Sequence, residues 1–298
     1  MTAITPPTET EVANIENRRG SHVWHVIRRD PLAMFSISII VLFLVIAIFA
    51  PLLAPYPEQG AGKSNPDTLY LEPSWQHPFG TDELGRDVLS RVMYGARPAF
   101  IIPMLVVTLA VLVGAPLGAI AGYKGGWIDE VIMRTTDLFL AFPSLLLAMA
   151  ITAALGRGLE NAAIALIISW WPWYTRLVRG IAVGLRERPF VEAAQSIGVR
   201  DSVIILRHIL PNSISPILVQ ITVDMGTVIL VAGGLAFIGL GTQPPEADWG
   251  LMISTGRTAV LNQWWISFFP ALAIFVLILA FNLLGDVLRD ILDPRQYQ

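Results

Sequence analysis

The sequence predicts an all-α, polytopic membrane protein with six transmembrane helices. Of its 298 residues, 54% are hydrophobic and only 14% are charged, whereas soluble domains carry about 25% charged residues. A helix needs roughly 20 mostly apolar residues to cross a bilayer. Five stretches are free of charge and a sixth contains only Asp224; they cover 31–57, 98–123, 138–156, 161–175, 212–240 and 258–285. We therefore expect a membrane protein rather than a soluble domain.

These stretches divide the chain into five parts. We expect a cytoplasmic N-terminal tail (1–30), a first transmembrane helix (31–56), an extracytoplasmic loop (57–97), a five-helix core (98–290) and a cytoplasmic C-terminal tail (291–298). The apolar run from Ala33 to Ala50 is longer than the apolar region of a signal peptide, and no A-x-A site follows it. The first helix is therefore expected to stay in the mature protein.

The distribution of Lys and Arg predicts the orientation in the membrane. With a cytoplasmic N-terminus, thirteen of these residues fall in inner segments, six in outer segments and Arg134 within a helix. Inner loops carry the excess of positive charge in membrane proteins. We therefore expect both termini and the 188–211 segment to be cytoplasmic, and the 57–97 loop to be outside.

The outer loop contains a turn followed by an apolar pattern. Gly80, Thr81 and Asp82 form the turn, with Asp82 as a candidate helix cap. Apolar residues then recur at helical spacing, namely Leu84, Val88, Leu89 and Val92. The pattern predicts either a short amphipathic helix along the outer interface or a lead-in turn to the second span.

The 188–211 segment has the pattern of two short helices joined by a glycine. Pro189 suits the first helical turn, and Gly198 can provide a left-handed stop. One face of this first helix is apolar, made of Phe190, Ala193, Ala194 and Ile197. Asp201 is a candidate cap of a second helix, 202–210, which Pro211 would end. The segment is either a lever that inserts its apolar face into a partner or an ordinary polar loop with interfacial helices.

Several motifs resemble those of permease subunits of ABC importers, in the dipeptide and oligopeptide (DppC/OppC-like) family. In the 188–211 segment they are Glu192, Ala193, Ala194, Gly198, Asp201, Leu210 and Pro211, which resemble the loop that couples such permeases to an ATPase. Outside, the matching motif contains Gly80, Thr81, Asp82, Gly85, Arg86 and Asp87. Further matches extend the resemblance over about residues 25–295.

The resemblance implies a type I ABC-importer (MetI-like) permease fold in the bacterial inner membrane. It also implies a heterodimer with a second, homologous permease, two cytoplasmic ATPase subunits and an extracytoplasmic solute-binding protein. The implied substrates are short peptides; nickel, glutathione or another small solute are alternatives. ATP and Mg²⁺ would bind to the ATPase partners, with no cofactor on this chain and no nucleic-acid partner.

Charged residues within the apolar stretches are candidates for the transport pathway or a subunit interface, since burial in a bilayer is costly. Arg134 and Asp137 are spaced to pair on one helix face. Asp224 has no obvious partner nearby in the sequence; we expect it either to face the central cavity or the partner permease, or to form a structural hydrogen bond within its own subunit. Pro143 and Pro172 are expected to kink their helices.

Motifs of other protein classes are missing from the sequence. It has no Walker A pattern for ATP, no H-E-x-x-H or G-x-S-x-G pattern, no cysteine, and four scattered histidines. We therefore expect a non-enzymatic subunit without a metal site. An intramembrane enzyme would need a catalytic constellation, and a secondary transporter using Asp137 and Asp224 would leave the 188–211 segment unexplained.

Overall fold

The computed structural model describes residues 30–292 of the chain, so the predicted tails 1–30 and 291–298 lie almost entirely outside the described residues. In this range all regular structure is helical, apart from one isolated bridge between Thr81 and Asp87. The longer helices are α2 (Pro31–Leu53), α4 (Val88–Lys124), α5 (Gly126–Leu140), α6 (Ser144–Leu155), α7 (Leu159–Arg186), α10 (Leu210–Phe237) and α12 (Trp265–Leu292). The shorter ones are α3 (Pro57–Gly60), η1 (Pro66–Thr68), α8 (Pro189–Ser196), α9 (Asp201–Ile204), η2 (Ile205–Ile209) and α11 (Trp249–Gly256).

Four helices within 30–292 are long and apolar enough to cross a membrane: α2, α4, the continuous helix 201–237 and α12. The pair α5 and α6, bent by 85° at a short break, makes a fifth if it is one span. The break contains Pro143, which confirms the expected kink there. Helix α7 is long enough but carries three arginines in its second half, so its membrane crossing stays a prediction.

Helices α4 and α7 form the closest pair in the bundle. Gly114, Gly118 and Gly122 lie one turn apart on α4, and each faces the backbone of α7. A Cβ added at Gly122 would lie 2.6 Å from the carbonyl oxygen of Arg179. Small residues at this spacing let two membrane helices approach until their backbones touch.

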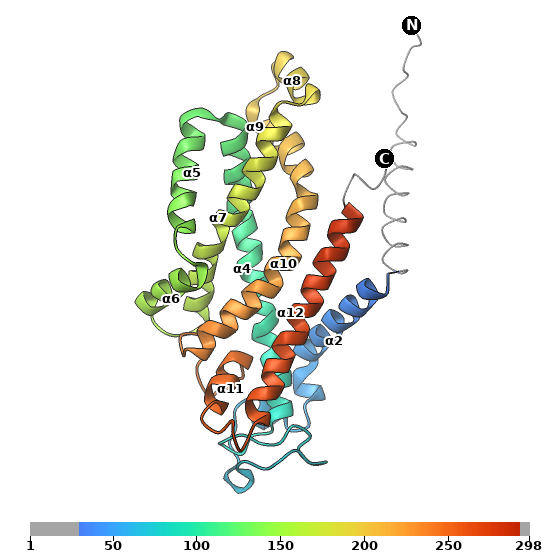
Figure 1. Cartoon of the computed structure of the whole chain (residues 1–298), viewed down its shortest axis with the longest axis vertical. Coiled ribbons are helices and arrows are strands. Elements are labelled where there is room, and N and C mark those ends of the chain that lie inside the picture. Colours follow the sequence, from blue (N-terminus) through green and yellow to red (C-terminus); the bar gives the residue numbers. More distant parts are fainter. Residues whose placement is uncertain (1–29, 293–298) are drawn as a thin grey trace.

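The remaining long helices surround this pair. Helix α10 packs on α4, α7 and α12, while α2 packs on α12 and α4 at the side of the bundle (Figure 1). Most of α2 is apolar and exposed, and its only buried residues are Ala33, Ser36, Ala47 and Ala50. An exposed apolar face of this extent is expected of a helix that contacts lipid.

The expected amphipathic helix does not form a separate element in the outer loop, and the predicted boundary between 97 and 98 falls inside a helix. Helix α4 begins at Val88 and continues without interruption to Lys124. Its N-terminal cap is Asp87, whose carboxylate accepts hydrogen bonds from the backbone N–H and hydroxyl of Ser90 at 2.8 and 2.7 Å. Asp82 instead closes the preceding turn, so the alternative of a lead-in turn fits the structure.

Candidate functional site

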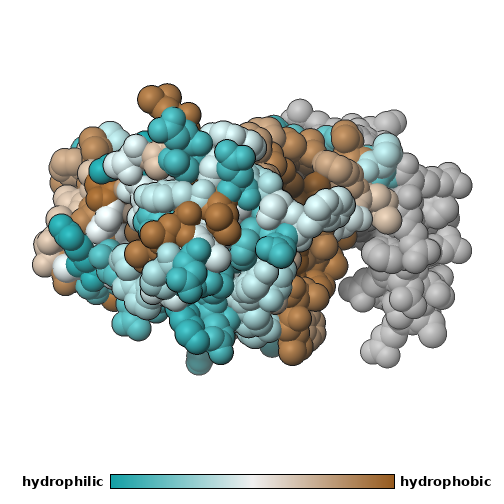
Figure 2. All heavy atoms as spheres, turned by 90° about the horizontal axis from the view of Figure 1, so that it is seen from below, coloured by the Kyte–Doolittle hydropathy of each residue, from teal (hydrophilic) through white to brown (hydrophobic). Residues whose placement is uncertain are grey.

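The 188–211 segment and the outer loop lie at opposite ends of the bundle. Helices α8 and α9 are at one end, and the 57–87 loop with α11 is at the other (Figure 1). Seen from the latter end, hydrophilic residues occupy much of the middle of the face, and apolar surface lies mainly toward its flanks (Figure 2). A hydrophilic end on a bundle of apolar helices is the arrangement of a protein that spans a bilayer.

The first predicted helix of the 188–211 segment is confirmed. Helix α8 runs from Pro189 to Ser196 with the proline in its first turn. Gly198 follows with φ of 79°, and its backbone N–H donates to the carbonyl of Gln195 at 2.9 Å. Among the described residues no heavy atom lies within 4 Å of a Cβ built at Gly198. The position therefore favours glycine because of its left-handed backbone conformation, and not because a side chain would lack space.

The predicted apolar face of α8 is correct only in part. Phe190 is 44% exposed and Ile197 is 81% exposed, and Ala193 is exposed with them. Ala194 instead is buried with Val191 against the core of its own chain. Helix α8 therefore has one face anchored to the bundle and a second apolar face that is largely exposed, where Phe190 lies against His208 and Ile197 is open.

The predicted second helix does not end at Pro211. Helix α9, the π-helical turn η2 and α10 form one continuous helix from Asp201 to Phe237. In the π turn the N–H of Leu210 bonds to the carbonyl of Ile205. Pro211 then occupies the first turn of α10, where a proline without an N–H is tolerated.

Asp201 does not cap this helix, which corrects a second expectation. Its side chain contacts the end of α4: Oδ1 accepts a hydrogen bond from the Tyr123 hydroxyl at 3.0 Å, and Oδ2 accepts one from the Lys124 ammonium group. The Tyr123 hydroxyl also accepts a hydrogen bond from Gln195 Nε2 at 3.1 Å. No sequence pattern indicated this contact, since Tyr123 and Asp201 are 78 residues apart.

The predicted pair between Arg134 and Asp137 is wrong. Arg134 lies 3.7 Å from Glu130 on its own helix. Asp137 instead accepts a hydrogen bond at 2.5 Å from Arg176 of α7. Because α7 lies beside α5, the guanidinium group of Arg176 reaches Asp137, whereas that of Arg134 lies near Glu130. Asp137 therefore joins two helices.

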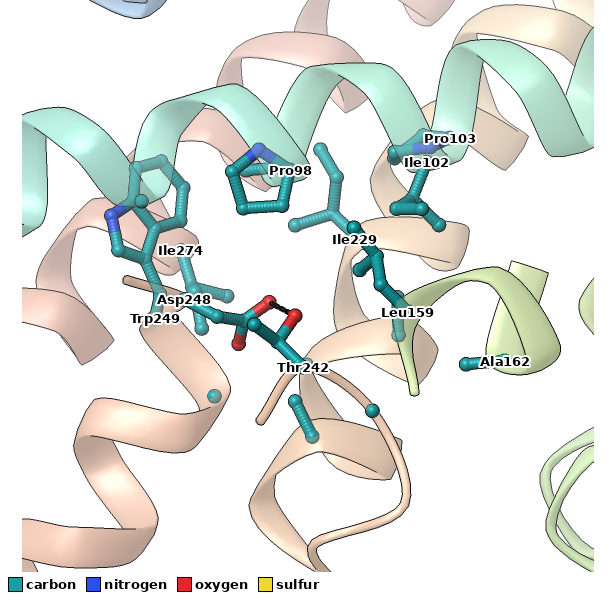
Figure 3. A pocket seen from close by; sticks show the side chains of 17 residues that line it. Pro98, Ile102, Pro103, Leu159, Ala162, Ile229, Thr242, Asp248, Trp249 and Ile274 are labelled. Carbon is teal, nitrogen blue, oxygen red and sulfur yellow. Dashed lines mark hydrogen bonds between the residues drawn. The ribbon is translucent and has the colours of Figure 1, made fainter. Parts of the chain in front are cut away.

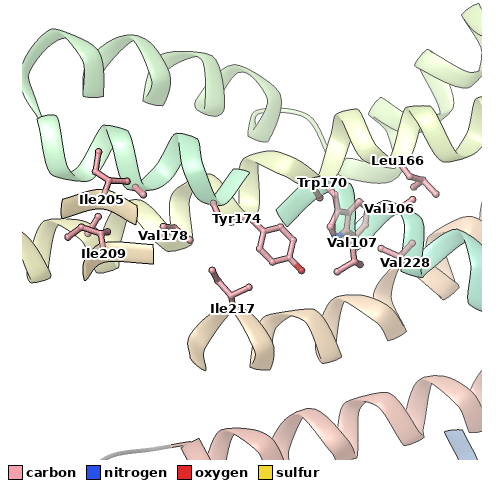
Figure 4. Close-up of a cluster of buried hydrophobic side chains, with 14 of the residues drawn as sticks. Val106, Val107, Leu166, Trp170, Tyr174, Val178, Ile205, Ile209, Ile217 and Val228 are labelled. Carbon is pink, nitrogen blue, oxygen red and sulfur yellow. The ribbon is translucent and has the colours of Figure 1, made fainter. Parts of the chain in front are cut away.

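Asp224 is buried within its own chain, with 6% of its surface exposed. Oδ1 accepts a hydrogen bond at 3.1 Å from Gln220, one helical turn earlier. Oδ2, the Trp170 indole N–H and the Tyr174 hydroxyl lie beside one another without a hydrogen bond among the described residues. Figure 4 shows Tyr174 extending from α7 toward α10. This position favours the structural alternative over an open cavity.

The outer motif forms a buried polar network. Gly80 and Gly85 have positive φ values of 71° and 72° and close the turn. Asp82 Oδ1 accepts the N–H groups of Leu84 and Arg86, both at 2.9 Å, and its Oδ2 accepts Arg86 Nε at 2.7 Å. Arg91 continues the network to the carbonyl of Glu246 at 3.0 Å. These contacts hold the outer loop against the segment that precedes α11.

The Thr81–Asp87 bridge joins the two ends of that turn. Thr81 is buried, and its hydroxyl donates to the carbonyl of Thr68. Asp87 Oδ1 contacts His77 Nδ1 at 2.9 Å, and the His77 ring stacks on Tyr56. The motif residues that the sequence indicated outside are therefore brought together in one structural unit.

A small cavity lies near the same end of the bundle as the outer motif, between α4, α10 and α11 (Figure 3). It is mostly apolar, but Asp248 lies in its wall and accepts hydrogen bonds from Thr242 Oγ1 and the N–H of Leu251, both at 3.1 Å. Burial raises the pKa of the Asp248 carboxyl above its ordinary value. Asp248 caps α11, and the sequence analysis did not identify it.

Two family models match this chain. One describes a binding-protein-dependent transport system inner membrane component and covers residues 114–297. The other describes the N-terminal transmembrane domain of oligopeptide transport permease C and covers residues 19–73. The two matches together include the first helix, the end of α4, and all later helices with the 188–211 segment.

Several relatives cover nearly the whole chain. A dipeptide transport system permease protein DppC of Alkalihalophilus pseudofirmus is 44% identical over 98% of this chain and 94% of its own length. A probable D,D-dipeptide transport system permease protein DdpC of Escherichia coli is 44% identical over 92% and 90%. A glutathione transport system permease protein GsiD of Shigella sonnei is 45% identical over 91% and 89%.

A solved structure has the same fold. The inward-facing MetNI methionine ABC transporter contains a chain that matches with a TM-score of 0.55 at 15% identity, over 68% of this chain and 97% of that chain. The shared fold supports the predicted MetI-like architecture.

Proposed function

Because the chain belongs to the family of inner membrane components of binding-protein-dependent transport systems, we propose that it forms half of the pathway through which an ATP-driven importer carries short peptides. The observation that supports this most strongly is the 44% identity to a dipeptide permease over 98% of the chain. A substrate of two residues is the simplest inference, since another relative is named for D,D-dipeptides.

The energy would come from partner subunits. The sequence contains no Walker A pattern, and α8 presents a largely exposed apolar face at Phe190 and Ile197. We propose that this face, with Phe190 and Ile197, inserts into a groove of a cytoplasmic ATPase. Two such ATPases, which bind ATP and Mg²⁺, would serve this chain and a second, homologous permease.

The proposed orientation follows from charge. In the topology predicted from the sequence, thirteen Lys and Arg residues belong to the inner segments, with the 188–211 segment, and six to the outer segments. Both termini and α8 are accordingly cytoplasmic in the proposal, and the protein lies in the inner membrane. The 57–87 loop and α11 would then face the extracytoplasmic solute-binding protein.

Glutathione transport is a second candidate, favoured by the 45% identity to a glutathione permease. The experiment is uptake into liposomes that contain the complete importer with ATP inside, using labelled dialanine and labelled glutathione as separate probes. ATP-dependent uptake of dialanine supports the proposal, and uptake of glutathione alone selects the second candidate. Uptake driven by an ion gradient without ATP would contradict both and favour a secondary transporter.

A further inference from the structure

Tyr123 is the last buried residue of α4, and its hydroxyl group contacts both halves of the 188–211 segment. The residue is 4% exposed. Its hydroxyl oxygen accepts a hydrogen bond from Gln195 Nε2 on α8, and its O–H donates one to Asp201 Oδ1 on α9. These two partners lie on either side of Gly198, so a single hydroxyl bridges the glycine between the two helices.

The glycine itself leaves this connection weakly determined. A Cβ added at Gly198 would meet no heavy atom within 4 Å beyond its chain neighbours, so side-chain packing at Gly198 itself does not fix the angle between α8 and α9; the backbone hydrogen bonds across it run from Gly198 to Gln195 and from Val199 to Ala194. Lys124 pairs with the other oxygen of Asp201, but both side chains are about half exposed, and exposed ion pairs contribute little. The Tyr123 hydroxyl is therefore the side-chain contact that joins α8 and α9 to α4, beside the burial of Val191 and Ala194 in the bundle.

The other end of this connection is rigid. Gly122, next to Tyr123, packs against the carbonyl of Arg179 with no room for a side chain. A force on α8 that reaches Tyr123 is thus passed directly to the α4 and α7 pair. Without the Tyr123 hydroxyl, α8 would still be linked to the bundle through α7 before it, the helix after it and its buried Val191 and Ala194, but it would lose its hydrogen bond to α4.

We propose that Tyr123 is a positioning residue of the importer: its hydroxyl fixes the angle between α8 and α9 and transmits the movement of α8 to α4. This inference rests on the proposed function, because it assumes that α8 is moved by an ATPase. It predicts that loss of the hydroxyl lowers the amount of substrate carried per ATP without preventing assembly.

The test is Tyr123→Phe in the complete importer reconstituted in liposomes, with labelled dialanine and labelled glutathione as probes. We expect normal assembly, an ATPase rate within about twofold of wild type, and a ratio of solute carried to ATP hydrolysed that falls about tenfold, the effect of losing a hydrogen bond to a charged group. The control is Tyr56→Phe, which removes a tyrosine hydroxyl and its one hydrogen bond, to the carbonyl of Gln76 at 3.1 Å, at the other end of the molecule.

Variants of Asp201 separate the hydrogen bond from the ion pair. Asp201→Asn keeps an acceptor for the Tyr123 hydroxyl and should keep most of the wild-type ratio of solute carried to ATP hydrolysed, whereas Asp201→Ala should lower this ratio. When either substitution is combined with Tyr123→Phe, the two double variants should have equal ratios. An unchanged ratio in Tyr123→Phe, or equal parallel losses of ATPase rate, uptake and assembly, would overturn the inference alone. Absence of ATP-dependent uptake of either probe by the wild type would overturn the proposed function and this inference with it.

Discussion

Arg179 of α7 holds Asp129 of α5 through two parallel hydrogen bonds, from Nε to Oδ1 and from Nη2 to Oδ2, both 2.6 Å long. The planar guanidinium group matches the carboxylate in this geometry. A second contact, between Arg176 and Asp137, lies further along the same two helices. Helix α5 has few buried residues of its own, so these polar contacts largely fix its position against α7.

Removing the charge of Asp129 should loosen this contact. We expect Asp129→Asn to lower the free energy of unfolding by about 1 kcal/mol, the upper end for a partly exposed pair. Thermal unfolding of the purified protein in detergent measures the change. Glu130→Gln is the control, because Glu130 is exposed and its only ion pair within residues 30–292 is the 3.7 Å contact with Arg134; an equal loss in both variants would contradict the role assigned to the bidentate pair.

Adding a methyl group between α4 and α7 should separate them. At Gly118 a Cβ would lie 2.9 Å from the backbone nitrogen of Arg179 and still nearer the carbonyl oxygen of Thr175. We expect Gly118→Ala to destabilise the fold by about 1–3 kcal/mol, as overpacking does, and to reduce the yield of monodisperse protein in size-exclusion chromatography. Gly184→Ala on α7 should behave as wild type, because a Cβ there meets no described atom within 4 Å.

The left-handed backbone of Gly198 predicts which substitutions that position accepts. Gly198→Val should strain φ of 79° by about 1–2 kcal/mol and lower both transport and stimulation of the ATPase, with insertion into the membrane unchanged. Gly198→Asn should be close to wild type, since asparagine tolerates this conformation. Uptake assays on the two variants measure the difference, and wild-type transport by Gly198→Val would show that the angle at Gly198 is unimportant.

A charge reversal on the exposed side of α8 probes docking independently of the backbone. Glu192 is exposed and makes no side-chain ion pair among the described residues. We expect Glu192→Lys to weaken association with the ATPase while the permease itself inserts and folds normally. Co-purification of the ATPase subunits measures this, and an unchanged yield of ATPase would argue against contact at Glu192.

The burial of Asp224 predicts a structural role for its side chain. Asp224→Asn keeps the size and the hydrogen bond with Gln220, so assembly and transport should stay close to wild type. Asp224→Leu removes the acceptor of the Gln220 amide and places an apolar side chain beside the buried Trp170 and Tyr174 groups, and an unsatisfied buried group costs about 1–3 kcal/mol. Assembly yields of the two variants test this. A normal yield for Asn together with altered substrate preference would instead place Asp224 in the pathway.

The sequence predicted the features that depend on neighbouring residues. Pro189 and Gly198 bound α8 because a proline begins and a glycine ends a helix through local backbone geometry. The outer start of α4 was missed because Arg91 and Arg97 interrupt the apolar pattern. Both side chains donate hydrogen bonds to backbone carbonyl groups of other segments: Arg97 to Ala47 at 2.9 Å, and Arg91 to Glu246.

Contacts between distant segments were beyond the sequence pattern. The choice of Asp137 between Arg134 and Arg176 depends on how closely α5 approaches α7, and local spacing holds no information on that distance. The contact of Tyr123 with Asp201 likewise exists only because α4 ends beside α9. The burial of Ala194 follows from the orientation of α8 against the bundle, which helical spacing alone does not define.

The central claim is that the exposed face of α8 docks on an ATPase in the cytoplasm. The sequence has no cysteine, so single cysteines at Ile197 and Ser64 report on the two ends of the molecule without background. Both positions are exposed in the structure. A membrane-impermeant thiol reagent is applied to intact cells, to inside-out vesicles stripped of ATPases, and to the same vesicles after the ATPases are added back.

We expect Ser64→Cys to be labelled in intact cells, and Ile197→Cys to be labelled only in stripped inside-out vesicles and protected when the ATPases return. Protection is expected because Ile197 would enter a groove that excludes the reagent. Labelling of Ile197→Cys from outside intact cells, or equal labelling with and without the ATPases, would contradict the account.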